Sequence, residues 1–152
     1  MQPSQNQINT FVPCIIEFGS KEYRSMCELR NEILRKPIGL ILTETEKNND
    51  KKDILLCVME NENVVACCIL TEKNPKTVQL RQMAVAEKYQ LLGIGKMLLH
   101  FAEKIALENH FSEIFMHARK TALDFYKKNG YSIIGQEFTE VGIPHFEMIK
   151  KI

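Results

Sequence analysis

Two glycines that stand one residue apart mark the first place in this sequence where a specific chemistry can be inferred. Gly93 and Gly95 lie in the stretch YQLLGIGKML, directly before a long segment with helical apolar spacing. The first backbone N–H groups of a helix have no intrahelical partners, and the helix dipole adds partial positive charge at the same end. Glycines let the oxygens of an anion approach that backbone closely. The junction therefore predicts a site for a phosphorylated ligand, with a simple tight turn as the structural alternative.

The spacing of this loop excludes two well-known phosphate-binding motifs. A Walker loop needs G-x-x-x-x-G-K-[ST], but Gln90 stands at its first glycine and Met97 replaces the hydroxyl that binds magnesium. A dinucleotide fingerprint needs G-x-G-x-x-G, and Leu98 stands at its third glycine. The loop is therefore not predicted to bind ATP or NAD.

Other reactive residue types form no comparable pattern. The four histidines show neither H-E-x-x-H nor mixed Cys/His ligand spacing, so no metal site is predicted. The five cysteines are odd in number, lack C-x-x-C pairs and mostly lie in apolar stretches, which indicates buried free thiols. Cys67 and Cys68 are consecutive in a strand-like run, so at most one of these thiols can face a cleft.

Composition limits the class of protein. A chain of 152 residues with 45% hydrophobic content is expected to form one domain, residues 1–152. The formal net charge of +1 carries no electrostatic signal for nucleic acid. The polar N-terminus does not resemble a signal peptide, and no apolar run is long enough to span a membrane. The expectation is a cytoplasmic protein with no nucleic-acid or membrane partner.

The first third of the chain predicts one strand, one helix and a loop. Residues 11–18 are apolar and β-branched, and Pro13 favours an edge position because proline cannot donate to a neighbouring strand. Ser20 can cap an amphipathic helix that ends before Pro37. The run at 43–53 is polar and has no apolar face, so we expect a solvated loop there.

The middle of the chain alternates strands and a helix around the glycine pair. Residues 54–61 and 63–72 are strand-like runs joined by a short polar turn, which predicts an antiparallel hairpin. Residues 77–86 follow as a third antiparallel strand. The strongest helical periodicity covers 94–109. A strand at 113–118 comes after this helical crossover, so it is expected to run parallel to the strand before the glycines.

The C-terminal segment predicts a short helix and two closing strands. The helix covers 121–129 and ends at Gly130, the position that favours a left-handed cap. The strands cover 131–140 and 144–151. The whole order predicts an α+β fold (α/β mixed), with a mixed sheet and helices on both of its faces.

Two motifs resemble those of the GNAT superfamily of acyl-CoA-dependent N-acyltransferases. MAVAEKYQLLGIGKMLL (83–99) is similar to the central motif of the family, and ALDFYKKNGY (122–131) is similar to its downstream helix motif. GIPHFEMIKK (142–151) resembles a closing strand of the bacterial ElaA-like group. The resemblance covers about residues 12–151. It implies the GNAT fold: a central mixed sheet of six to seven strands, splayed between strands four and five, with helices on both faces.

This resemblance also implies a coenzyme and a site. Acetyl-CoA would be the cosubstrate, with its pantetheine arm paired to backbone groups of Met83, Ala84 and Val85. Tyr126 matches the general acid that protonates the departing thiolate of coenzyme A. The backbone amides that would bind the pyrophosphate belong to Gln90, Leu91, Leu92, Gly93, Ile94, Gly95 and Lys96.

Three positions depart from the family pattern. Leu91 stands where a glycine is common and Leu92 where a polar residue is usual. These leucines are expected either to seat the helix on the core or to shape the loop itself. Arg119 stands where many members have an asparagine that contacts the coenzyme, and a salt bridge or a phosphate contact is the expected replacement.

The general base is not identified by the motifs. The strand before the loop offers Gln79, Arg81 and Gln82 but no carboxylate. Histidine as a residue type can accept a proton near neutral pH, so His117 and His145 are candidates, and a water chain is the third.

The sequence therefore predicts an N-acetyltransferase that transfers the acetyl group of acetyl-CoA to a primary amine by direct attack in a ternary complex. The acceptor is unidentified, with small-molecule and peptide amines both open. The alternatives are a catalytically weak acyl-CoA-binding or sensing module and an interaction domain with a vacant loop. Homodimers are common in this superfamily, so a homodimer is an open expectation.

Overall fold

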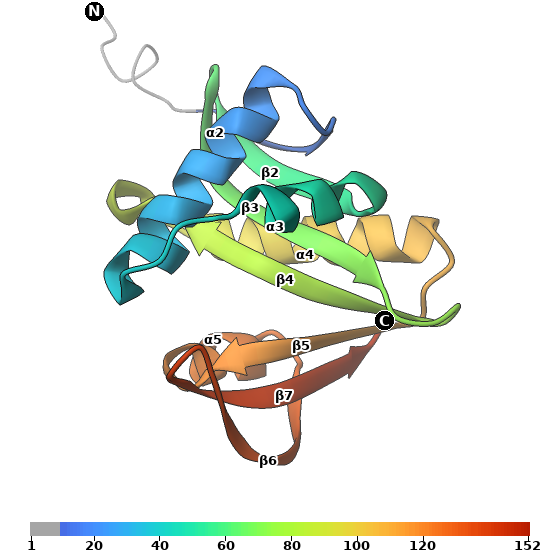
Figure 1. The fold of residues 1–152 in the computed structure, drawn as a ribbon. Helices are drawn as coiled ribbons and strands as arrows, with labels where there is room; N and C mark the ends of the chain where they lie inside the picture. The colour runs from blue at the N-terminus through green and yellow to red at the C-terminus, as the bar shows by residue number, and fades with distance from the viewer. Residues whose placement is uncertain (1–9) are drawn as a thin grey trace, which may run out of the picture.

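A seven-stranded sheet organises the computed structural model, which describes residues 10–152 (Figure 1). The strands lie in the order β1-β2-β3-β4-β5-β7-β6, and every neighbouring pair is antiparallel except β4 and β5, which are parallel. This confirms the predicted mixed sheet and the edge position of the strand with Pro13. The bounds are β1 (Phe11–Ile16), β2 (Ile54–Glu60), β3 (Asn63–Glu72), β4 (Thr77–Val85), β5 (Glu113–Arg119), β6 (Ser132–Glu140) and β7 (Ile143–Lys151).

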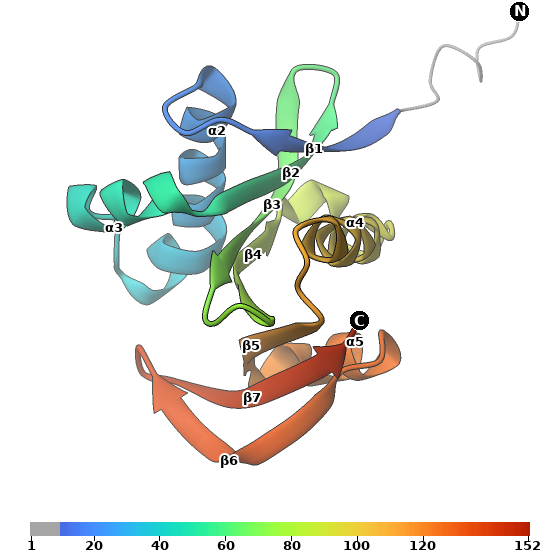
Figure 2. The same ribbon diagram turned by 90° about the vertical axis from the view of Figure 1, so that its right-hand side faces the viewer.

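Helices cover both faces of the sheet, as predicted (Figure 2). On one face lie α2 (Lys21–Arg30), prolonged by a π-helical turn (Asn31–Arg35) and a 3-10 turn (Lys36–Ile38), and α3 (Glu44–Asn49). On the other face lie α4 (Ile94–Glu108) and α5 (Leu123–Lys128). Further 3-10 turns cover Asp50–Lys52, Glu87–Tyr89 and Lys120–Ala122.

The central strand β3 shows why two apolar layers form. Cys67 and Ile69 pack into the cluster around α2, whereas Cys68 and Leu70 pack into the cluster around α4. Alternating side chains thus reach both helical layers, and neither Cys67 nor Cys68 is exposed to solvent. All five cysteines are free and four are buried, as predicted. Burial raises the pKa of the Cys67 thiol to about 12, so it remains an unreactive thiol.

The sheet opens between β4 and β5, as the resemblance implies. The two strands pair only over residues 77–80 and 113–116, and beyond this point β4 stays with β3 while β5 stays with β7 (Figure 1). A β-bulge opposite Cys68 marks the start of the divergence, with Gln82 at a left-handed φ of 57°. The unpaired edges of both strands therefore face a common opening.

The expected solvated loop at 43–53 is wrong. Thr43 and Glu46 form a capping box that starts α3, and the following turn carries Asp50, which is only 1% exposed. Asp50 accepts hydrogen bonds from Arg30 Nη1 at 2.7 Å and from the Tyr23 hydroxyl at 2.6 Å. These partners lie in α2, 20 and 27 positions earlier in the chain, so no local pattern could reveal the pairing.

The remaining bounds differ from prediction by one or two residues; the first strand, for example, ends at Ile16 rather than 18. No helix within residues 10–152 combines the length and the apolar character needed to cross a membrane. In the same residues, no three His, Cys, Asp or Glu side chains gather closely enough to hold a metal ion.

Candidate active site

A cavity of about 1000 Å³ lies in the opening between β4 and β5. Its walls come from four further parts of the chain: the N-terminus of α4, helix α5, the turn after α2, and the β6–β7 hairpin. Segments far apart in sequence therefore share one space. The lining includes Leu34, Arg35, Gln79, Arg81, Gln82, His117, Arg119, Phe125, Tyr126, Glu140 and His145.

The N-terminus of α4 presents an open turn of backbone amides to this cavity. Gly93 is the N-cap and has a left-handed φ of 80°, which glycine adopts without steric cost. Met97 is the first helical residue whose amide bonds back, to the Gly93 carbonyl at 3.0 Å. The three preceding amides, of Ile94, Gly95 and Lys96, form the first turn that has no intrahelical acceptor. Such a turn can bind an anion.

Gly95 lies where the first turn of α4 meets α5 and the end of β4. A Cβ atom at this position would lie 3.4 Å from Cζ of Phe125 and 3.7 Å from Cγ2 of Val85, which are ordinary van der Waals distances. The two glycines therefore differ in their surroundings: Gly93 turns the chain with open space beside it, and Gly95 lies against two walls of the cavity.

Most of the predicted coenzyme residues line the cavity, and two do not. The lining contains Met83, Ala84, Val85, Gln90, Leu91, Gly93, Gly95 and Lys96. The Ile94 side chain is 2% exposed and packs in the core, and the Leu92 side chain is 61% exposed, so neither lines the cavity. Gln90 Nε2 donates to the Val85 carbonyl at 3.0 Å, which fastens the loop to the end of β4.

The two loop leucines do not seat the helix on the core. Leu91 is fully exposed and Leu92 is largely exposed, so that hypothesis is wrong. Leu91 has a left-handed φ of 66°, the conformation that glycine would adopt more easily. Hydrophobic character alone does not determine burial, because a loop backbone can direct a leucine into solvent.

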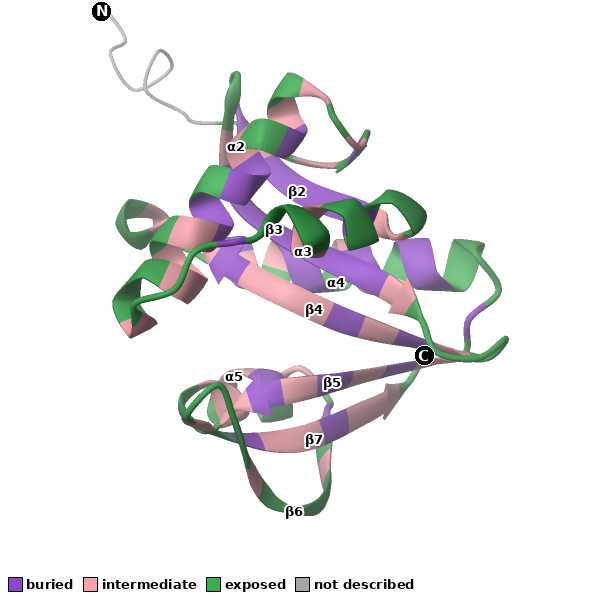
Figure 3. Cartoon of the chain, in the orientation of Figure 1, coloured by how far each residue is buried: buried purple, intermediate pink, exposed green. Residues whose placement is uncertain are grey.

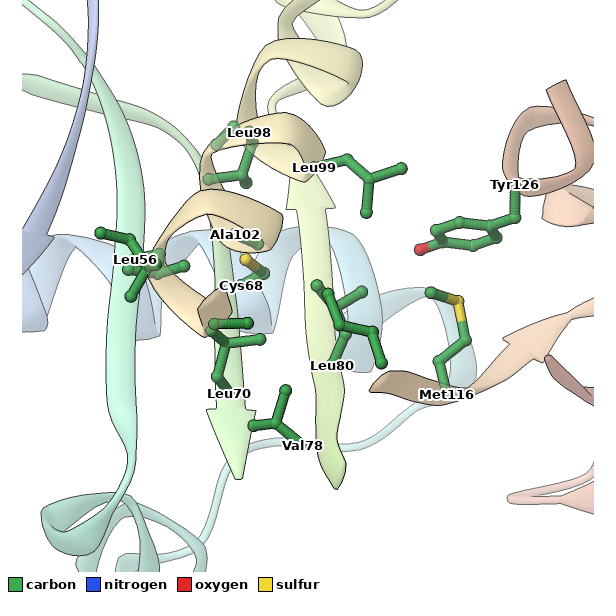
Figure 4. Packing of buried hydrophobic residues seen from close by; sticks show 14 of the residues in the cluster. Leu56, Cys68, Leu70, Val78, Leu80, Leu98, Leu99, Ala102, Met116 and Tyr126 are labelled. Atoms are coloured by element: carbon green, nitrogen blue, oxygen red, sulfur yellow. The ribbon is translucent and has the colours of Figure 1, made fainter. Parts of the chain in front are cut away.

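Tyr126 projects from α5 into the cavity. Figure 4 shows its ring reaching from α5 toward Leu80 and Leu99, beside Met116. Edge-to-face contacts with Phe125 (ring centroids 5.1 Å apart) and Tyr131 (5.8 Å) hold the ring. Burial, and to a lesser extent the nearby Cys68 thiol, raises the pKa of Tyr126 above its ordinary value. Its phenol therefore keeps its proton at neutral pH and can act as a donor.

On the opposite wall, the two histidines named from the sequence share one carboxylate. His117 Nδ1 lies 2.9 Å from Glu140 Oε1, and His145 Nε2 lies 3.7 Å from Glu140 Oε2. His145 Nδ1 is 2.7 Å from the Ile143 carbonyl, which can only accept, so this nitrogen carries a proton. His145 is buried and His117 is partly exposed, so His117 is the more accessible of the two.

Glu140 is a site residue that sequence reasoning missed. It ends β6, and the register of β6 with β7 and of β7 with β5 brings it to His117. The only signal in the sequence is its position beside the predicted Gly142 turn. Phe138 supports the arrangement, because its ring lies edge-to-face with His117 at 5.0 Å and stacks on His145 at 5.8 Å.

Helix α2 contacts the β-bulge at Gln82, which lies directly before the segment predicted to bind pantetheine. Arg30 Nε donates to Gln82 Oε1 at 3.3 Å, while the same guanidinium binds Asp50. Arg30 and Asp50 are each 1% exposed, so the pair is buried and needs these mutual contacts. The segment 43–53, which was expected to be a solvated loop, thus contributes Asp50, which binds the arginine that contacts Gln82 in the cavity wall.

Comparison with known proteins now gives the class. A family model described as "Acetyltransferase (GNAT) domain" matches residues 35–152, more than half of the chain. The chain therefore belongs to the GNAT family of acetyltransferases, which confirms the resemblance and the expected enzyme class.

Individual relatives and solved structures agree with this assignment. YyaT, an uncharacterised protein of Bacillus subtilis, is 37% identical over 76 residues, which are 50% of this chain and 51% of YyaT. The chain thus matches about half the length of its curated relatives.

Three solved structures share the fold at identities too low to show more than the fold. A Lactobacillus plantarum protein assigned as an N-acetyltransferase has a TM-score of 0.82 and 19% identity, over 94% of this chain and 99% of that one. Escherichia coli ElaA has a TM-score of 0.78 and 14% identity, over 95% and 100%. An Elizabethkingia anophelis GNAT family acetyltransferase with acetyl-CoA bound has a TM-score of 0.73 and 17% identity, over 93% and 98%.

Proposed function

We propose that this protein is an N-acetyltransferase that transfers the acetyl group of acetyl-CoA to a primary amine by direct attack in a ternary complex. One observation carries the proposal. The opening between β4 and β5 gathers an anion-binding helix terminus, a protonated phenol and a histidine–carboxylate pair around one cavity. These are the groups needed to bind a coenzyme phosphate, to protonate a leaving thiolate and to deprotonate an amine.

The coenzyme is proposed to lie along β4 with its pyrophosphate on the first turn of α4. Beyond Leu80, β4 is not paired with β5, so the backbone of Met83 to Val85 is available to an extended ligand strand. The amides of Ile94, Gly95 and Lys96 lie at the positive end of a 15-residue helix. The Elizabethkingia anophelis protein of the same fold has acetyl-CoA bound, which supports acetyl-CoA as the ligand proposed here.

His117 is proposed as the general base among the three candidates. Its Nδ1 donates to Glu140, which leaves the Nε2 lone pair free to accept a proton from the amine. Glu140 would hold this tautomer and favour the imidazolium that forms. His145 supports Glu140 from the buried side and is proposed as a positioning residue.

The proton and electron balance of the reaction is then complete. The amine lone pair forms the new C–N bond at the acetyl carbonyl carbon, and its proton passes to His117 Nε2. The C–S bond breaks, its electron pair leaves on sulfur, and the Tyr126 hydroxyl donates the proton that yields the free thiol. The acceptor would be a small-molecule amine or a peptide amine.

A thiol-release assay with acetyl-CoA across a panel of amines tests this function, with calorimetric titration of coenzyme A in parallel. Turnover that requires both Tyr126 and an amine supports the enzyme. Tight coenzyme binding without turnover on any amine supports the binding or sensing module instead. No binding of coenzyme A contradicts both and favours an interaction domain.

A further inference from the structure

The cavity has two chemically different sides, which are separated by the alternation of β5. Ile114, Met116 and Ala118 pack into the cluster around α4 and α5. Because successive side chains of a strand point to opposite faces, His117 and Arg119 lie on the face of α2. Arg119 Nη2 indeed donates across the cavity to the carbonyl of Leu34, in the turn after α2, at 3.3 Å. Arg119 therefore lies on the opposite side of the sheet from the α4 terminus.

Arg119 differs from the other arginines of the cavity in its partners. Arg35 is bound to Glu46 at 2.7 Å, and Arg81 lies 3.6 Å from Asp53. Within residues 10–152, Arg119 has no carboxylate within 4.0 Å, and its side chain donates to a single backbone carbonyl. A guanidinium has five donors in a planar fork that matches a carboxylate, so most of the binding capacity of Arg119 remains unused.

The strand register sets this cation beside the proposed base. Arg119 pairs with His145 across β5 and β7, and His117 pairs with Glu147. Arg119 and His117 are two positions apart on one strand, so their Cα atoms are about 7 Å apart. Glu140 lies against His117, and Glu147 Oε1 is 3.9 Å from His117 Nε2. The α2 side of the cavity thus offers a guanidinium without a carboxylate partner and the Glu140 carboxylate beside the base, with Glu147 close to His117 outside the cavity lining.

Resting on the proposed function, we infer that the acceptor is an amine that itself carries a carboxylate, that is, an amino acid. Its carboxylate would bind Arg119 by a charge-assisted pair of hydrogen bonds, and its ammonium group would be drawn to Glu140 and Glu147. The ammonium group would release one proton to solvent before the attack, and the resulting amine would pass its proton to His117 during the attack. A polyamine lacks the anionic group and would leave Arg119 uncompensated beside a second cation. The coenzyme phosphates are provided for separately, at the α4 terminus on the other side.

The test compares acceptors whose carboxyl group is free, esterified or absent. Each of L-lysine, L-ornithine and L-phenylalanine is assayed with acetyl-CoA against its methyl ester and its decarboxylated amine (cadaverine, putrescine and phenethylamine). We expect the free carboxylates to show a kcat/KM about 10- to 100-fold higher, through KM rather than kcat. Equal or better use of the esters and decarboxylated amines overturns the inference.

Variants of Arg119 assign the effect to this residue. Arg119→Gln should remove the preference for the carboxylate by raising KM about 10- to 100-fold for amino acids, with little change for their esters. Arg119→Lys should retain part of the preference, because the charge remains and the fork is lost. Arg24→Gln removes an exposed arginine of α2 and is the matched control, with no expected effect.

Two binding measurements separate this inference from the proposed function. Calorimetry with coenzyme A should give the same Kd for wild type and Arg119→Gln; a marked loss would make Arg119 a phosphate contact and overturn the inference. Calorimetry with L-lysine in the presence of coenzyme A should detect binding that cadaverine does not reproduce. If every amine fails to react but this lysine binding persists, the proposed function fails while the carboxylate site stands. If amines react without regard to their carboxyl group, the proposed function stands and the carboxylate site is rejected.

Discussion

The arm of the sheet made by β1 to β4 is covered on both faces, whereas the arm made by β5, β7 and β6 is packed mainly on one. In Figure 3 the strands β2 and β3 are largely buried, β5 alternates between buried and intermediate, β7 is mostly intermediate with two buried residues, and β6 is mostly exposed. We call these, with their helices, the N-terminal arm (β1–β4 with α2, α3, and α4 with its N-terminal turn) and the C-terminal arm (β5–β7 with α5). Their strands pair with each other only along residues 77–80 and 113–116.

This difference in burial matches a difference in chemistry. The N-terminal arm offers the cavity unpaired backbone, namely the second half of β4 and the open turn at Gly93, beside side chains such as Gln79 and Arg81. The C-terminal arm contributes side chains: Tyr126, His117, Glu140 and Arg119. A strand with one face free of helices can direct polar side chains into a cavity, because that face need not be filled with apolar groups. The comparison predicts that changes in the N-terminal arm alter binding of the coenzyme and changes in the C-terminal arm alter turnover.

The largest expected effect is in the C-terminal arm, from Tyr126→Phe. Loss of the proton donor should lower kcat about 1000-fold while the Kd of coenzyme A, measured by calorimetry, stays the same. Tyr131→Phe is the matched control, because Tyr131 is also a buried tyrosine but its hydroxyl donates to Glu103 at 2.9 Å and does not line the cavity. Full activity in Tyr126→Phe would exclude Tyr126 as the acid.

The pH profile gives a second test of Tyr126. The active phenol is protonated, and its pKa is raised by burial, so loss of activity through its ionisation should begin only above the ordinary tyrosine value of about 10. Rates of thiol release measured between pH 6 and 11 check this. A loss of activity near pH 8 that Tyr126→Phe abolishes would contradict the raised pKa.

The next effect is expected from His117→Gln. Removal of the base should lower kcat/KM about 100-fold, because the amine then lacks the group that takes its proton. Glu140→Gln should lower kcat/KM about tenfold, because Glu140 orients His117. His100→Gln changes an exposed histidine of α4 and should leave kcat/KM unchanged. An unchanged kcat/KM in His117→Gln would return the role to His145 or to water.

In the N-terminal arm, Gly93→Ala should act on binding. Its left-handed φ of 80° strains any other residue by about 1 kcal/mol, and the displaced turn should weaken coenzyme A about tenfold. Gly135→Ala is the matched control, since Gly135 has a similar φ of 77° with the same open surroundings but lies in β6. We expect both variants to lose a similar amount of melting temperature, and only Gly93→Ala to bind coenzyme A more weakly. If the two variants have the same Kd for coenzyme A, the assignment of coenzyme binding to the N-terminal arm is wrong.

The smallest effect is expected from Leu91→Gly. Glycine relieves the left-handed strain at position 91, which stabilises the folded protein, but it also has more freedom in the unfolded chain, which destabilises the folded protein. Because these two effects nearly cancel, the free energy of unfolding should rise by less than about 1 kcal/mol. Coenzyme affinity should change by less than about twofold, because backbone amides do the binding. Leu92→Gly has no left-handed strain to relieve and should slightly destabilise the protein. Thermal unfolding and calorimetry distinguish the two, and a large loss of affinity in Leu91→Gly would show that this leucine shapes the loop.

The fold was largely predictable because its elements carry local signals. The hairpin at Asn61–Asn63, the helical stripe after Gly93 and the cap at Gly130 each depend on neighbouring residues, and each was placed within two residues. The turn at 43–53 was not, because the burial of Asp50 depends on Arg30 and Tyr23 from another helix. A polar residue with a distant partner is indistinguishable in sequence from one in water.

The sequence by itself determined the fold, the family and the position of the anion-binding turn, because glycine spacing and apolar periodicity act on the backbone within a few residues. Only the tertiary structure brought Glu140 to His117 and His145 and left Arg119 without a carboxylate partner, because these contacts depend on strand register across β5, β7 and β6. Only it showed that Leu91 is exposed and that Gly95 lies against Phe125 of α5 and Val85 of β4. Backbone conformation is specified by near neighbours, whereas the side chains that carry chemistry are brought together by residues far away in the chain.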